Sequence, residues 1–220
     1  MYQEVIMNTP EDIILISEKM IDDIKRNTNK KINDKIYVTL TDHISNLLER
    51  ISMGIVFDSS LLWNVRALYP EEYGLAKSAV SLLSRHLDLK IPSDEANFIA
   101  IHIVNSEMNL DLQETVNITR TIDSVMHLIT NEFKGIALIE DSLDYARFVL
   151  HLRYLLQRII QNEALNSHKE DNMLKLLFKE YPKQGELVTK IVSVLSDKYK
   201  KEIAGERLFL MIHVIRLTTN

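Results

Sequence analysis

The sequence repeats itself once, and this internal repeat constrains the fold more than any other feature of the chain. The segment YVTLTDHISNLLERI at 37–51 aligns with YARFVLHLRYLLQRI at 145–159, and EANFIAIHIV at 95–104 aligns with ERLFLMIHVI at 206–215. The spacing between the two copies changes by only a few residues along the chain, which small differences in loop length explain. A duplicated segment of this length indicates two homologous structural units.

The repeat predicts two domains in tandem. A chain of 220 residues is long enough for two domains, because single domains usually contain about 100–200 residues. The polar segment MNLDLQETVN at 108–117 lies between two helical patterns and is the natural junction. We therefore expect a first domain at 1–110 and a second at 111–220.

The apolar residues follow a helical period. In TPEDIILISEKMIDDIKRN (9–27) they recur three or four residues apart, as on one face of a helix. The chain has only five Gly and four Pro and contains no alternating strand pattern. We predict an all-α protein made of two five-helix bundles. The expected helices are 10–28, 34–53, 58–69, 71–88 and 93–108 in the first bundle, and 113–134, 142–162, 170–180, 183–200 and 205–218 in the second.

Composition excludes several classes of function. No apolar run approaches the ~20 residues of a membrane-spanning helix, and the first residues lack the layout of a signal peptide, so we expect a cytoplasmic protein without membrane insertion. The chain has no Cys, which excludes disulfides and thiolate chemistry. A net charge of −5 argues against nucleic-acid binding by these residues themselves. Short metal-binding, nucleotide-binding and hydrolase motifs are missing from the sequence, and we expect no cofactor, no metal and no enzymatic activity.

The histidines give the strongest functional signal. Of seven histidines, four occupy two equivalent positions in both copies: His43 aligns with His151, and His102 with His213. Shared ancestry and packing would explain them as buried, hydrogen-bonded rings. Their retention among diverged neighbours favours a chemical role instead. Neutral imidazole is a nucleophile near neutral pH and can accept a phosphoryl group.

Phosphorylation of these four rings would work as an electrostatic switch. A phosphoryl group adds about −1.5 to −2 charges, by extension from other phosphorylated residues, and such a group at a packed surface must find a cation or repel its neighbour. Solvated surface residues remain the alternative for each candidate partner. The candidates that could bind the phosphate or orient a ring are Asp42, Arg50, Arg158 and Arg216. Other carboxylates, including Glu95 and Glu206, are expected to cap helices or lie on solvated faces.

Several motifs together resemble a known family. TDHI (41–44), DEANFIAIHIVN (94–105), FVLHLRYLLQRI (148–159) and SLLW (60–63) are similar to the tandem phosphotransferase-system regulation domains of the BglG/SacY/LicT family of bacterial transcriptional antiterminators. The resemblance runs from about residue 10 to the end. It implies five-helix bundles that form a homodimer, with phosphorylation at the four repeated histidines.

The resemblance also implies partners. The sugar-specific transporter component EIIB would phosphorylate mainly the first domain, to inactivate, and the carrier protein HPr mainly the second, to activate. Family members bind RNA through a small N-terminal domain, and nothing similar precedes TPEDIILI here. A second departure is Leu150 before His151, where the first copy has Asp42 before His43. The two histidines are therefore expected in different electrostatic settings.

Three alternatives remain open from the sequence. The same domains occur in DNA-binding transcription activators. A helical ligand-binding or scaffold module with structural histidines would show altered melting but no phosphorylation-dependent behaviour after His-to-Gln changes. A metal-dependent helical hydrolase would contain bound metal.

Overall fold

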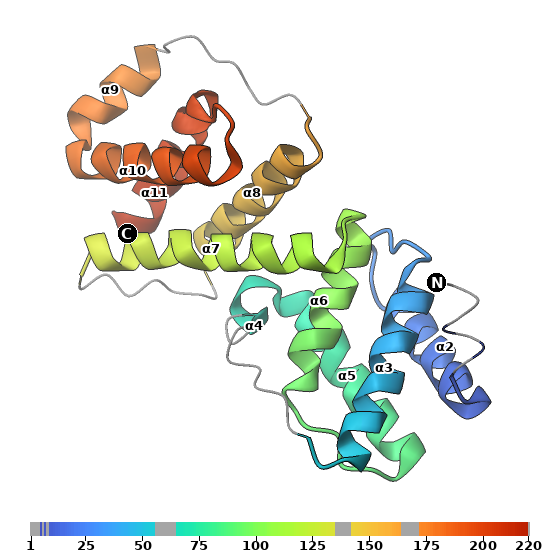
Figure 1. Ribbon diagram of the computed structural model, residues 1–220. Coiled ribbons are helices and arrows are strands. Elements are labelled where there is room, and N and C mark those ends of the chain that lie inside the picture. The colour runs from blue at the N-terminus through green and yellow to red at the C-terminus, as the bar shows by residue number, and fades with distance from the viewer. Residues whose placement is uncertain are drawn as a thin grey trace. The chain divides into compact units, whose positions relative to one another are not determined.

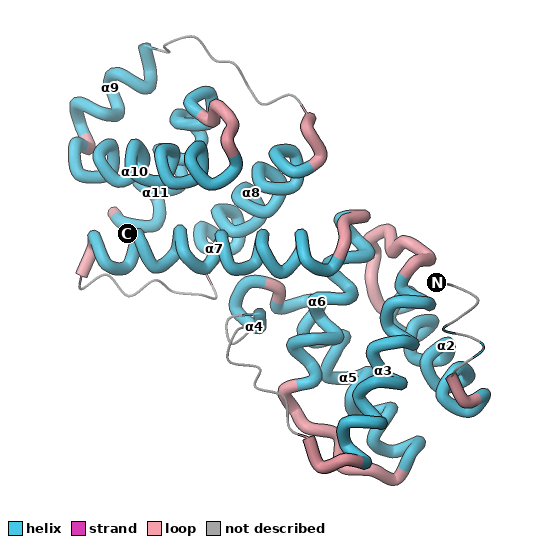
Figure 2. The backbone as a smooth tube through the Cα atoms, in the orientation of Figure 1, coloured by secondary structure: helices cyan, strands magenta, loops and turns pink. Residues whose placement is uncertain are grey.

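The structure is a computed structural model, and it describes residues 5, 7, 9–55, 65–134, 142–163 and 172–219. The chain divides into two compact units, Met1–Val116 and Asn117–Asn220. All regular secondary structure among the described residues is helical (Figure 2). The prediction of an all-α protein with two helical units in tandem is therefore confirmed.

The helices follow the expected order (Figure 1). In the first half these are α2 (Glu11–Arg26), α3 (Ile36–Ser52), α4 (Val65–Leu68), α5 (Pro70–Leu87) and α6 (Glu95–Met108). Next come α7 (Leu112–Glu132), α8 (Leu143–Ile160), α9 (Asn172–Glu180), α10 (Pro182–Tyr199), the short 3-10 helix η2 (Ala204–Glu206) and α11 (Arg207–Thr218).

The observed helix ends lie within two residues of the expected ends wherever both ends are described. The expected helix at 58–69 is the exception, because residues 56–64, including the SLLW motif, lie outside the described part of the chain. Its described portion is α4. The first two residues of the expected helix at 170–180 also lie outside it.

The first bundle closes around the apolar faces that the sequence pattern predicts. Helix α6 packs against α5, α3 and α4, while α2 packs against α3 and α5. Met20 of α2, Leu40 and Leu47 of α3, Leu83 of α5 and Ile99 of α6 are at most 1% exposed. Burial of such side chains contributes about 1.5–3 kcal/mol each, which fixes the rotation of α3 and α6 about their axes.

The second bundle uses the same devices at the repeated positions. Helices α5 and α10 both begin with a proline, Pro70 and Pro182, whose fixed φ suits the first helical position. Both end at a residue in the left-handed conformation, Asp88 with φ 49° and Lys200 with φ 53°. Helix α11 packs against α8, α9 and α10, so that α8 and α11 in the second unit pair as α3 and α6 do in the first.

One polar cluster distinguishes the two units. Lys30, in the loop between α2 and α3, lies 2.7 Å from the carboxylate of Glu72, 2.8 Å from that of Glu71 and 3.8 Å from that of Glu107. At the positions equivalent to Glu72 and Glu107 the second unit has a neutral pair, in which Gln184 donates to Thr218 at 3.1 Å. The first unit thus fastens this region with charge, and the second with a neutral hydrogen bond.

Candidate functional site

The first two histidines meet at the packed interface of α3 and α6. His43 lies on α3 and His102 on α6, and their ring centroids are 5.0 Å apart at an interplanar angle of 49°. Phe98, one turn before His102, places its ring 5.9 Å from that of His43. Residues separated by 59 positions are therefore joined in one site by the packing of two helices.

A buried carboxylate orients the His43 ring. Oε2 of Glu95, in the first turn of α6, lies 3.0 Å from Nε2 of His43, and Oε1 accepts a hydrogen bond from Arg50 at 3.3 Å. Glu95 is only 4% exposed. Arg50 is two turns after His43 on α3, so the carboxylate bridges two side chains on the same helical face.

His102 is the more buried of the two rings. It is 5% exposed, and its Nδ1 is buried without a hydrogen-bond partner among the described residues. Burial, and to a lesser extent the nearby His43 ring, lowers the pKa of His102 to about 3. The ring also lines a cavity of about 460 Å³ whose wall includes Asp42, Asn105 and Leu110. His102 is therefore a buried ring, neutral at pH 7, that borders this cavity.

The second unit repeats this geometry. The rings of His151 on α8 and His213 on α11 have centroids 5.1 Å apart, and Phe209 lies 5.9 Å from His151. Nδ1 of His213 is buried without a partner among the described residues, as in His102. Burial, together with the His151 ring, lowers the pKa of His213 to about 4.

The carboxylate of the second unit is engaged differently. Glu206 is fully buried, and its Oε1 accepts a hydrogen bond from Arg158 at 3.2 Å. Its Oε2 lies 3.8 Å from Nε2 of His151, beyond hydrogen-bond distance. Burial lowers the pKa of His151, and the neighbouring Arg158 acts in the same direction. The second unit thus has the same set of side chains, but its glutamate does not hydrogen-bond the His151 ring as Glu95 does the His43 ring.

The four residues predicted to bind phosphate or orient a ring differ in where they lie. Arg50 and Arg158 lie at the two sites, where they bind the buried carboxylates. Asp42 is exposed on the cavity wall and accepts a hydrogen bond from Asn46 at 3.3 Å. Arg216 is exposed, and its charge lowers the pKa of His213.

Sequence reasoning missed the two carboxylates. Glu95 and Glu206 were expected to cap helices or to lie on solvated faces, and this expectation is wrong, because they are 4% and 0% exposed and each binds an arginine of the site. The repeat contains the signal that could have found them, since the alignment of 95–104 with 206–215 places Glu95 on Glu206.

The three remaining histidines lie away from these clusters or are not described. His86 on α5 is exposed, and the side chain of His127 on α7 is 54% exposed and lies 3.5 Å from Asp123. His168 lies outside the described residues. Within the described ranges, no group of three His, Asp or Glu side chains could hold a metal ion.

Comparison with known proteins identifies the repeated unit. The family model of the PRD domain matches residues 18–106 and 123–217. The chain belongs to the PRD domain family. Each of the two PRD matches contains one histidine pair and its buried glutamate, so the duplicated site and the duplicated domain coincide. No helix among the described residues is long and apolar enough to cross a membrane.

Several known proteins are similar along nearly the whole chain. The transcription antiterminator LicT of Bacillus subtilis is 33% identical over 217 residues, covering 98% of this chain and 78% of that protein. The beta-glucoside operon antiterminator of Dickeya chrysanthemi is 28% identical, covering 97% of this chain and 75% of that protein. The GlcT protein of Staphylococcus saprophyticus is 27% identical, covering 100% and 78%. Among solved structures, GlcT CAT-PRDI is 31% identical with a TM-score of 0.46, covering 48% of this chain and 63% of that one.

Proposed function

We propose that the chain is the regulatory part of a bacterial transcriptional antiterminator, in which two PRD domains at about 1–110 and 111–220 respond to phosphorylation at His43, His102, His151 and His213. The similarity to proteins named as antiterminators supports this class of function. The net charge of −5 does not suit binding to RNA phosphates, so RNA would be bound by a separate domain outside these 220 residues. The protein would act in the cytoplasm.

The observation that carries the proposal is the duplicated pair of rings beside a buried glutamate. The two pairs have nearly the same spacing, 5.0 and 5.1 Å. Burial keeps His102 and His213 neutral at pH 7, and a neutral ring is the form with a lone pair that can attack phosphorus. Structural histidines would instead be expected to have both ring nitrogens satisfied when buried, which is not so for Nδ1 of either residue.

Differences between the two surfaces support different phosphoryl donors. On α3 the exposed residues beside His43 are polar, Asp42 and Asn46, whereas the equivalent residues of α8 are Leu150 and Tyr154, which are 46% and 56% exposed. A donor must contact this face to reach the ring. We assign the transporter component EIIB to the first domain and HPr, the general carrier, to the second.

The output of the switch would be dimerisation. Phosphate on the first domain would place like charges opposite each other across a two-fold axis and oppose closure of a homodimer. Phosphate on the second domain would favour closure where it meets an arginine, either Arg158 or Arg216 or one of the partner subunit. Availability of the transported sugar, which drains phosphate from the transporter, would thus control antitermination of genes for sugar utilisation.

Mapping of phosphohistidine tests the proposal directly. We expect incubation with phosphorylated HPr and EIIB to label the four repeated histidines, as located by mass spectrometry under conditions that avoid acid. Variants that retain one histidine at a time would assign each donor. Label confined to His86, His127 or His168 would contradict the proposal.

The dimerisation step needs a separate measurement. His102→Asp introduces a fixed negative charge in the first domain, and we expect it to weaken self-association in analytical ultracentrifugation. His86→Asp places the same charge on an exposed position of α5 and serves as the matched control. If His102→Asp and His86→Asp dimerise with equal dissociation constants, charge at His102 does not control dimerisation.

A further inference from the structure

We infer that the two histidines of each bundle present opposite ring nitrogens to the phosphoryl donor. His43 and His151 would be phosphorylated on Nδ1, and His102 and His213 on Nε2. This inference rests on the proposed phosphorylation of these residues and adds to it which atom of each ring forms the bond.

For His43, the hydrogen bond to Glu95 decides which nitrogen is free. A neutral imidazole carries a proton on one nitrogen and a lone pair on the other. Nε2 lies 3.0 Å from a carboxylate oxygen of Glu95, which can only accept a hydrogen bond while it is ionised. Nε2 therefore carries the proton, and the lone pair that can attack phosphorus is on Nδ1.

For His102, the access of the donor to the ring selects the other nitrogen, Nε2. Its Nδ1 is buried and has no hydrogen-bond partner among the described residues, so a donor's phosphoryl group cannot reach that atom and the dianionic product would have no polar contact there. The same ring lines the cavity of about 460 Å³. Nε2 is the nitrogen left for a reaction that approaches through this space.

The second bundle gives the same assignment through burial alone. Nε2 of His151 and Nδ1 of His213 are both buried atoms, so the reactive nitrogens are again Nδ1 on α8 and Nε2 on α11. In the first bundle a hydrogen bond to Glu95 blocks Nε2 of His43, and in the second bundle packing beside Glu206 blocks Nε2 of His151. Two different local contacts thus leave Nδ1 as the reactive nitrogen in both rings.

The chemical step is balanced without any additional group. The Nδ1 lone pair of His43 attacks the phosphorus of a phosphohistidine or phosphocysteine on the donor, the new N–P bond forms, and the donor's N–P or S–P bond breaks with its electron pair returning to the donor. His43 keeps its proton on Nε2, and the positive charge that develops on the ring lies against the Glu95 carboxylate. Glu95 is a positioning residue, because it touches the ring and not the phosphoryl group.

The test identifies the isomer of phosphohistidine formed at each position. Full-length variants that retain one of the four histidines would be phosphorylated by HPr or EIIB and, in parallel, by potassium phosphoramidate, a small chemical donor. Two-dimensional ¹H–¹⁵N correlation of the ring distinguishes Nδ1 from Nε2 phosphorylation. We expect the Nδ1 isomer at His43 and His151 and the Nε2 isomer at His102 and His213. An Nε2 product at His43 or an Nδ1 product at His102 would overturn the inference.

The two donors separate this inference from the proposed function. If the proteins transfer nothing while phosphoramidate labels the predicted nitrogens, the proposed regulation is wrong and the assignment of the reactive atoms stands. If the proteins label the four histidines on the other nitrogens, the proposed regulation stands and the assignment is wrong.

Substitution of Glu95 tests its positioning role. Glu95→Ala opens space beside Nε2 of His43, and we expect the product to change from the Nδ1 isomer alone to a mixture of both isomers. Glu95→Gln keeps that space filled and is expected to retain the Nδ1 isomer, which controls for loss of packing. Glu49→Ala, at an exposed acid on α3, the helix of His43, is the matched control. Unchanged isomer composition in Glu95→Ala would exclude Glu95 as the residue that hides Nε2.

Discussion

Oε1 of Glu206 lies 3.2 Å from the guanidinium group of Arg158, and Glu206 is fully buried whereas the Arg158 side chain is 27% exposed. The carboxylate has been removed from water, and the arginine reaches it from the surface. Removing one partner of such a pair is costly because the other charge stays buried. The stability of the second bundle therefore depends on an arginine that also lies beside the proposed phosphorylation site.

We predict that Arg158→Met lowers the free energy of unfolding of the second unit by about 2–3 kcal/mol, less than the ~3–5 kcal/mol of a fully buried ion pair because the arginine is partly exposed. Arg50→Met is expected to cost less, since Glu95 keeps its 3.0 Å contact with His43. Urea unfolding followed by circular dichroism measures both. Equal losses in the two variants would contradict the difference that the structure indicates.

The pH dependence of stability follows from the buried ring of His102. Its pKa in the folded protein is lowered to about 3 by burial, below the ~6.5 of an unfolded chain. The unfolded state thus binds a proton first, and stability present above pH ~6.5 is lost as the pH falls towards 3, by at most about 1.4 kcal/mol per pH unit for this group. We expect His102→Gln to reduce the loss of stability between pH 7 and pH 5 in urea unfolding. His86→Gln, at an exposed ring, would leave the slope unchanged.

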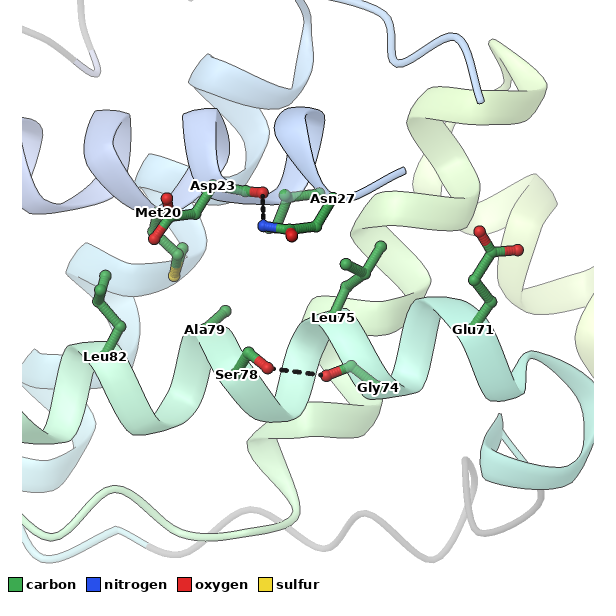
Figure 3. Close-up of a pocket in the computed structure, with 10 residues that line it drawn as sticks. Met20, Asp23, Asn27, Glu71, Gly74, Leu75, Ser78, Ala79 and Leu82 are labelled. Atoms are coloured by element: carbon green, nitrogen blue, oxygen red, sulfur yellow. Dashed lines mark hydrogen bonds between the residues drawn. The ribbon is translucent and has the colours of Figure 1, made fainter. Parts of the chain in front are cut away.

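Two helical glycines are expected to respond oppositely to alanine. Gly74 of α5 lies on a cavity of about 360 Å³ between α2 and α5, near Ser78 and Asn27 (Figure 3), and a Cβ built there meets nothing within 4 Å. Gly74→Ala is therefore predicted to stabilise the protein by about 0.5–1 kcal/mol, the usual difference in helix interiors. A Cβ on Gly185 would lie 2.9 Å from the Phe178 ring, so Gly185→Ala is predicted to gain nothing or to destabilise. Thermal unfolding distinguishes the two.

The donor preference of the second domain is expected to depend on Leu150. Leu150→Asp gives α8 the residue that α3 has beside its own histidine, and we predict at least a several-fold slower transfer from HPr to His151, because a desolvated carboxylate would repel the incoming phosphoryl group. The rate is measured by quenched labelling at fixed ionic strength. Leu176→Asp on α9, which is 67% exposed in the native protein, controls for charge alone. If Leu150→Asp accepts phosphate from HPr as fast as the native protein does, Leu150 does not determine the choice of donor.

The helices could be predicted from sequence because their determinants are local. Apolar spacing along α2 and the prolines that open α5 and α10 depend on residues close together in the chain, and the ends agree within two residues. The duplicated histidines were visible because a second copy of the sequence acts as an internal comparison.

The carboxylates of the site could not be recognised in the same way. Glu95 lies 52 residues from His43 in the sequence, and nothing local to SDEANF distinguishes a buried acid from a helix-starting one. Their contact arises only when α6 packs on α3. Asp42 is adjacent to His43 in sequence but is exposed and accepts a hydrogen bond from Asn46, because neighbours along a helix point in different directions.

Lys30 and its carboxylates make one region of the first unit more sensitive to salt than the equivalent region of the second. The Lys30 side chain is 37% exposed, so dissolved ions can weaken its attraction to Glu71 and Glu72, whereas the neutral contact of Gln184 with Thr218 has no net charge for ions to screen. We expect rising potassium or sodium concentrations to weaken the attachment of the α2–α3 loop to α5 in the first unit and to leave the Gln184–Thr218 contact unaffected. Changes in the ionic composition of the cell would then weaken this charged fastening of the first unit and leave the corresponding neutral contact of the second unit unchanged.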